Sequence, residues 1–123
     1  MSAMTQSQED YLETIYMIIK DGQPALVRDV ARLLNVKMPS VVKAIHELKK
    51  LGLVEQKPYA DIVLTAKGRR VAGLVLNRHT LLRNFLMKLG VSRVTADKDA
   101  CLMEHILSAE TIDKIRTFNE GQV

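Results

Sequence analysis

The sequence predicts a mainly α-helical protein, in which a winged helix-turn-helix is followed by a helical dimerisation domain. Apolar residues recur at helical spacing along most of the 123-residue chain. One segment, residues 53–65, instead has the short apolar runs and the central turn of a β-hairpin. We therefore expect residues 1–70 to form the winged helix-turn-helix, which would bind DNA, and residues 71–123 to form the helical domain.

The first half of the chain contains three expected helices and the hairpin. The helices are expected over residues 7–20, 24–34 and 39–51, and the strands over residues 53–57 and 62–65. Asp21 and Gly22 follow the first helix, and Pro39 opens the third, where a proline needs no hydrogen-bonding N–H. The expected inward-facing residues of the third helix are Val42, Ile45 and Leu48.

The second half contains helices only. They are expected over residues 66–89 and 92–107 and from residue 108 onward, with a break in the first of them near Asn77. Thr65 and Ser108 are suitable N-cap residues. Several apolar residues of these helices are candidates for a dimer surface, although some of them must fill the core: Leu74, Leu82, Phe85, Leu102, Ile106, Ile112 and Ile115.

Positive charge is concentrated in the middle of the chain. The formal net charge is +4, but residues 26–70 carry ten Lys or Arg against four Asp or Glu, a net of +6. Such a basic segment is typical of a phosphate-binding surface, although a solvated charged face has the same composition. No apolar run approaches the roughly 20 residues of a membrane span. The single cysteine excludes an internal disulfide and favours a reducing, cytoplasmic location.

In this fold the helix from Met38 to Lys50 would be the recognition helix that enters the major groove of double-stranded DNA. The expected DNA-binding residues are Arg28, Lys37, Pro39, Ser40, Lys43, Ala44, Glu47, Lys50, Lys57 and Tyr59. Winged helices also serve as protein-interaction modules. The alternative is therefore a metal-independent winged-helix module that binds DNA or protein.

A possible metal site lies near residue 101. In a helix, Cys101, Glu104 and His105 would project from one face, and a thiolate, a carboxylate and an imidazole suit a divalent transition metal. Taken singly, each has a simpler explanation, since a lone cysteine is most often a small buried hydrophobe. A catalytic Cys–His pair is less favoured, because no glycine-rich or helix-N-terminal oxyanion site lies nearby in the sequence. We do not expect an enzyme.

The chain resembles the diphtheria-toxin-repressor family of iron- and manganese-dependent repressors from about residue 7 to residue 116. The matching stretches are EDYLETIY at 9–16, the helix at Pro39, LTAKG at 64–68, RH at 78–79 and CLMEHILS at 101–108. The resemblance implies a homodimer that binds palindromic operators when loaded with metal and that lacks the SH3-like domain of longer members. It implies the following metal ligands: Asp10, Glu13, His79, Cys101, Glu104 and His105.

At four positions that distinguish the branches of the family, the residues of this chain do not all match the same branch. Asp10 is a carboxylate, as in the manganese branch, whereas Cys101 is a thiol, as in the iron branch. Arg83 and Asp97 replace a glutamate and a histidine of the iron branch's ancillary metal site, which argues against an ancillary site of that kind. Because a thiolate softens the ligand set, we expect Fe(II) to be favoured, with Mn(II) possible.

Overall fold

The computed structural model describes residues 4–121 and divides into two compact units, with the boundary between Gly73 and Leu74. The helices are α1 (Gln6–Lys20), α2 (Val27–Leu34), α3 (Met38–Lys50), α4 (Ala66–Lys88), α5 (Arg93–Met103) and α6 (Ala109–Asn119), and the strands are β1 (Val54–Glu55) and β2 (Val63–Leu64). The expected mainly α-helical class, with a winged helix-turn-helix before a helical domain, is confirmed.

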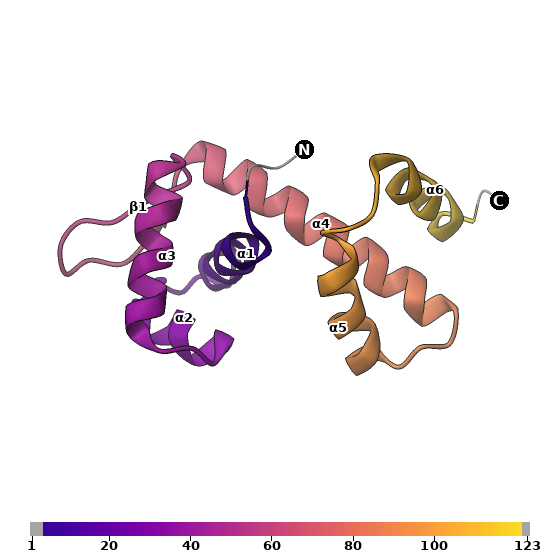
Figure 1. Cartoon of the computed structure of the whole chain (residues 1–123), viewed down its shortest axis with the longest axis horizontal. Helices are drawn as coiled ribbons and strands as arrows, with labels where there is room; N and C mark the ends of the chain where they lie inside the picture. The colour runs from indigo at the N-terminus through magenta and orange to yellow at the C-terminus, as the bar shows by residue number, and fades with distance from the viewer. Residues whose placement is uncertain (1–3, 122–123) are drawn as a thin grey trace. The chain divides into compact units, whose positions relative to one another are not determined.

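The first unit is a three-helix core with a hairpin wing. Thr5 and Gln8 form a capping box that starts α1, and α1, α2 and α3 pack on one another around buried aliphatic residues such as Leu12, Ile15 and Leu48. β1 and β2 pair in antiparallel register, with Val54 opposite Leu64. Figure 1 shows the three helices gathered together and the loop between the strands extending away from α3.

The start of α4 is fixed to the turn between α3 and β1. Thr65 caps the helix as expected, because its Oγ1 accepts from the Gly68 N–H at 2.9 Å and donates to the Gly52 carbonyl at 2.7 Å. Gly68 lies so close to this turn that an added Cβ would be 1.9 Å from the Leu53 carbonyl oxygen. Only glycine permits this approach, which sets the direction in which α4 leaves the wing.

Two expectations for the first unit were wrong. α2 begins at Val27 rather than Pro24, because Ala25 is extended and its carbonyl accepts from the Ile62 N–H at 2.8 Å. On α3, Val42 is 57% exposed, and the buried residues are Val41, Ala44, Ile45 and Leu48. Two adjacent valines left the phase of the helix ambiguous, and packing selects Val41.

The second unit consists of α4 from Leu74 onward, α5 and α6. Its core contains Leu82, Ala100, Ile112 and Ile115, and Phe85 packs edge-on against Phe118 with ring centroids 5.5 Å apart. Ser108 caps α6 as expected. The expected break near Asn77 is absent, since α4 is continuous through it. Within the described residues, no helix is long and apolar enough to cross a bilayer.

The seven candidates for a dimer surface separate into two groups. Leu82, Ile112 and Ile115 are buried in the core of the second unit, and Phe85 packs against it. The exposed candidates are Leu74 at 60%, Leu102 at 58% and Ile106 at 78%. These three residues are therefore the candidates for a dimer surface that the second unit does not bury in its own core.

Candidate functional site

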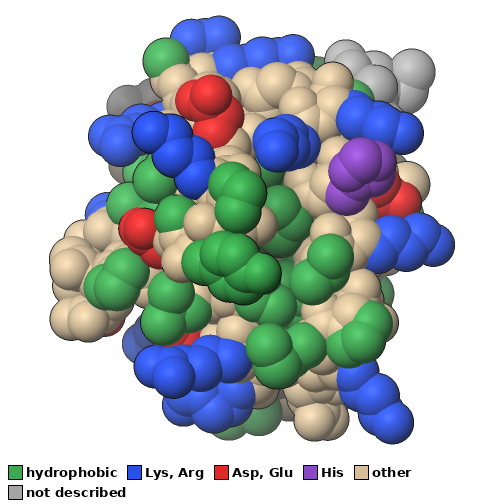
Figure 2. Space-filling model, turned by 90° about the vertical axis from the view of Figure 1, so that its left-hand side faces the viewer, with side chains coloured by type: hydrophobic (Ala, Val, Ile, Leu, Met, Phe, Trp, Pro, Cys, Tyr) green, Lys and Arg blue, Asp and Glu red, His purple; other side chains and the backbone are tan. Residues whose placement is uncertain are grey.

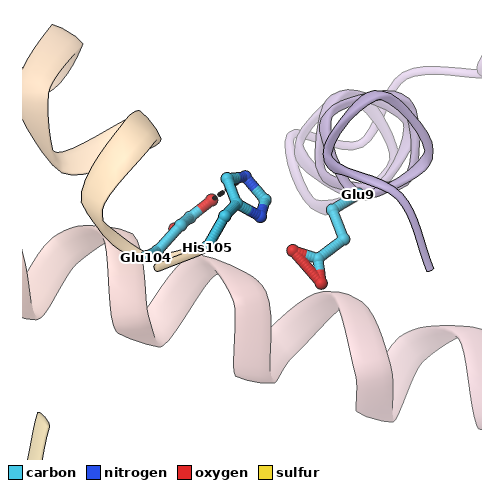
Figure 3. Close-up of side chains that lie close together, drawn as sticks. All are labelled: Glu9, Glu104 and His105. Atoms are coloured by element: carbon cyan, nitrogen blue, oxygen red, sulfur yellow. Dashed lines mark ion pairs between the residues drawn. The ribbon is translucent and has the colours of Figure 1, made fainter. Parts of the chain in front are cut away.

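A buried carboxylate lies beside two imidazoles in the second unit. The Glu104 side chain has no exposed area, and its Oε1 lies 3.4 Å from His105 Nε2 (Figure 3). Its other oxygen, Oε2, lies 3.9 Å from Nδ1 of His79 on α4. The side chains of His79 and His105 are 16% and 13% exposed. The structure thus brings together three of the predicted ligands within one unit.

The end of α5 sets this arrangement. The helix was expected to continue to residue 107 but ends at Met103, with Glu104 as its C-cap. The backbone then tightens, since the N–H groups of His105 and Ile106 donate to carbonyls three residues earlier, and Ser108 starts α6. Glu104 and His105 are therefore not on a continuous helix, although the local turn still brings their side chains to one another.

The other three predicted ligands lie on helices: Cys101 on α5, and Asp10 and Glu13 on α1. Cys101 is a partly buried thiol on the last turn of α5. Asp10 and Glu13 are partly buried on α1 of the first unit, three residues apart and hence on one side of that helix. Their neighbour Glu9, which we did not predict as a site residue, is only 3% exposed. A buried carboxylate is unusual enough to make Glu9 a further candidate ligand.

The donors of the second unit fit a divalent transition metal. Burying a carboxylate is costly unless a cation or hydrogen-bond donors compensate its charge. A divalent ion bound by Glu104 would supply such a charge, and the two imidazoles would offer lone pairs to the same ion. Imidazole, carboxylate and thiolate are ligands that Fe(II), Mn(II), Co(II) and Zn(II) accept in different orders of preference.

An ion-pair network that sequence reasoning did not predict lies behind His79. Asp97 Oδ1 is 3.4 Å from His79 Nε2 and 3.5 Å from a terminal nitrogen of Arg83. The second oxygen of Asp97 faces Arg93 Nε at 4.0 Å. Arg83 follows His79 by one helical turn on α4, whereas Asp97 belongs to α5, so the network depends on how these two helices pack.

The predicted DNA-binding residues are mostly exposed. Lys37, Pro39, Ser40, Lys43 and Lys50 are exposed on α3 or at its start, as are Arg28, Lys57 and Tyr59 elsewhere in the first unit. Two residues differ from expectation. Ala44 is 5% exposed and belongs to the core, so it is not on the outer face, and Glu47 is partly buried and accepts from Gln8 Nε2 at 3.2 Å.

The corrected phase of α3 adds three residues to its outer face. Val42, His46 and Lys49 are exposed there and were not predicted. Figure 2 shows the side of the molecule on which Figure 1 draws α3 and the hairpin, with apolar side chains across the middle and Lys or Arg above and below them. A surface that is apolar in the middle and basic at its margins suits base edges flanked by phosphates.

Family models match both units of the chain. Residues 3–62 match the N-terminal DNA-binding domain of iron-dependent repressors, and residues 65–121 match the metal-binding and dimerisation domain of the same repressors. The two matches together cover most of the chain, and they confirm the resemblance found from the sequence.

Several relatives align over nearly the whole chain. An uncharacterised helix-turn-helix-type transcriptional regulator of Methanocaldococcus jannaschii is 40% identical, over 95% of this chain and 95% of its own length. The regulator MntR of Shouchella clausii is also 40% identical, over 96% of this chain and 85% of its own length.

Solved structures of similar fold include longer proteins. The manganese regulator SloR superimposes with a TM-score of 0.83 at 26% identity, covering 98% of this chain and 56% of that one. IdeR of T. acidophilum superimposes with a TM-score of 0.79 at 29% identity, over the same two shares. The chain thus spans a little more than half of these two structures. The family models and the relatives together show that the chain belongs to the iron-dependent repressor family of metal-dependent transcriptional regulators.

Proposed function

We propose that this protein is a homodimeric repressor that binds palindromic operator DNA when it is loaded with a divalent metal ion. The observation that carries the proposal is the buried Glu104 carboxylate beside two imidazoles. It lies in the segment that matches a metal-binding and dimerisation domain. Carboxylate and imidazole are both common ligands of divalent transition metals, which supports the proposal.

We propose that the metal ligands are the six residues that the sequence predicts: Asp10, Glu13, His79, Cys101, Glu104 and His105. Two of them belong to the first unit and four to the second. Binding of one ion by donors of both units would favour those conformations in which all donors reach it. A ligand shifts such an equilibrium only by its differential affinity for the conformations. This differential affinity would couple metal binding to DNA binding.

The DNA-binding surface under this proposal is the outer face of α3 together with the wing. Lys43, Lys49 and Lys50 are exposed on α3 and would contact phosphates, and Val42 is placed to contact an apolar group in the major groove. In a homodimer two such helices would read half-sites about one helical turn apart, which gives the operator its palindromic form.

The test is operator affinity with and without metal. An operator is first selected from random duplexes with the metal-loaded protein, and its binding is then measured by fluorescence anisotropy at a fixed salt concentration. We expect binding to tighten when Mn(II), Fe(II) or Co(II) is added and to return to the starting value when the ion is chelated. Affinity that is the same in both conditions would favour the metal-independent winged-helix module.

Metal selectivity gives a second test. SloR, a structural relative, is a manganese regulator. Cys101 offers this chain a thiolate, however, which is softer than a carboxylate and suits Fe(II) better than Mn(II). We therefore propose that Fe(II) is the favoured ion and Mn(II) the second.

The variant Cys101→Glu should lower the ratio of Fe(II) to Mn(II) affinities, measured by competition with a chelator under anaerobic, reducing conditions. Cys101→Ser serves as a control for the loss of the thiol without the gain of a carboxylate. If the ratio is the same in the wild type and both variants, Cys101 is a structural residue and not a ligand.

A further inference from the structure

We propose that Asp97 is a positioning residue for His79, which it holds with Nε2 protonated so that Nδ1 is the nitrogen available to a metal ion. The inference rests on the proposed function, in which His79 is a ligand. It concerns a carboxylate that is not among the six predicted metal ligands.

The geometry around the His79 ring distinguishes its two nitrogens. Nε2 lies 3.4 Å from Asp97 Oδ1, within hydrogen-bonding distance. Nδ1 faces Glu104 Oε2 at 3.9 Å, is buried, and makes no hydrogen bond to any group in residues 4–121. A neutral imidazole carries one proton. The closer acceptor, Asp97, therefore takes the N–H, and the lone pair is left on the side of the buried Glu104.

The two carboxylates beside the ring differ in exposure and in the groups that lie beside them: Asp97 is 41% exposed, whereas Glu104 is buried. Both oxygens of Asp97 face guanidinium groups, since Oδ1 is 3.5 Å from Arg83 and Oδ2 is 4.0 Å from Arg93. Glu104 lies beside two imidazoles and its side chain is fully buried. A carboxylate already paired with two cations is a poor ligand for a third. Asp97 is thus suited to orient the ring of His79, and Glu104 is suited to bind the metal ion together with His79.

Arg83 completes the arrangement. Its guanidinium lies 3.5 Å from Asp97 Oδ1, and its side chain is 22% exposed, whereas that of Asp97 is 41% exposed. A guanidinium that anchors the carboxylate restricts its motion and so keeps the ring of His79 in one orientation. Carboxylate–histidine–metal arrangements of this kind typically change metal affinity by about 10–100-fold when the carboxylate is removed.

The experiment compares Asp97→Ala with Asp99→Ala in the full chain. Asp99 is an exposed carboxylate on the same helix, so its loss changes the net charge equally without touching His79. The first readout needs no metal: long-range proton–nitrogen spectra of the ¹⁵N-labelled apoprotein report which ring nitrogen of His79 carries the proton. The His79→Gln variant assigns the signals. The second readout is Co(II) affinity by competition with a chelator.

We expect His79 to be the Nε2–H form in the wild type and in Asp99→Ala, and a mixture of both forms in Asp97→Ala. Co(II) affinity should fall about 10–100-fold in Asp97→Ala alone. A wild-type ring protonated on Nδ1, or equal Co(II) affinities in the two variants, would overturn the inference while leaving the proposed function intact. A wild-type protein that binds no Co(II) would overturn both.

Discussion

The two units of the molecule differ in the size of their apolar cores. The core cluster of the first unit includes large side chains with no exposed area, among them Leu12, Ile15 and Leu48. The second unit has a small core around Leu82 and leaves Leu102 and Ile106 mostly exposed. Large apolar residues of the first unit, such as Leu33 and Val42, are exposed as well, so the units differ in core size and not in having exposed apolar residues.

The units also differ in where they place charge. In the first unit the basic side chains lie outside, on and around α3, where they are available to a polyanion. The second unit also has exposed charges, such as Asp99 and Glu110, but its Glu104 is buried and its Asp97–Arg83 pair is partly buried. The first unit therefore presents a basic surface, although it also buries Glu9 and contains two of the proposed metal ligands, Asp10 and Glu13. In our proposal the second unit depends on a bound ion and on a second copy of the chain.

The largest change is expected in the free energy of unfolding when a core residue of the first unit is replaced. Replacing Ile15, which is fully buried, by Ala should lower the free energy of unfolding by about 2–5 kcal/mol, because it removes buried methyl and methylene groups and leaves a cavity. Denaturant unfolding measures this loss, which should not depend on protein concentration. Met17→Ala, on the exposed side of the same helix, is the control and should change stability little. Similar losses for both variants would mean that this core is not as described.

A smaller effect on folding, but a specific one on assembly, is expected at Ile106. Because its side chain is 78% exposed, Ile106→Ser should leave the fold of the second unit intact and weaken the proposed dimer by about 1–2 kcal/mol. Sedimentation at several concentrations measures the change. Leu33→Ser, at a position 57% exposed on α2, is the matched control and should leave the dimer unchanged. If both variants dimerise like the wild type, the dimer surface lies elsewhere.

The smallest effect is expected for single lysines of α3. Lys43→Ala should weaken operator binding uniformly across sequences and reduce the slope of log affinity against log salt by about 1, because one phosphate contact is lost. Anisotropy titrations over a range of salt concentrations measure that slope. Lys98→Ala removes the same charge from an exposed position on α5 and should leave the slope as it is in the wild type. An equal change in both variants would mean that only net charge matters.

Most of the fold could be predicted because the sequence patterns that indicate its helices and strands are local. Helical periodicity, the caps at Thr65 and Ser108 and the hairpin pattern gave the order of the elements. The errors arose where a contact with a residue distant in the sequence determines the local structure. Ala25 leaves the second helix because it pairs with Ile62, and the phase of α3 depends on whether Val41 or Val42 meets the core. Neither contact has a signal within a short window of sequence.

The candidate site could be predicted to a similar extent. The spacing of Cys101, Glu104 and His105 pointed to metal chemistry, and the structure brings the last two together with His79. The network behind them could not be predicted, because Asp97 reaches His79 and Arg83 across two packed helices. The departure of Asp97 and Arg83 from the iron branch was visible in the sequence, but their pairing was not.

The central claim, that the second unit holds a metal ion through Glu104, is tested most directly by equilibrium dialysis of the full chain against Co(II). We predict that the wild type and Glu110→Gln, which changes an exposed carboxylate on α6, retain the ion, and that Glu104→Gln does not. Circular dichroism should show all three folded, because an amide replaces the buried carboxylate at nearly the same volume. Equal retention of Co(II) by Glu104→Gln and the wild type would contradict the account.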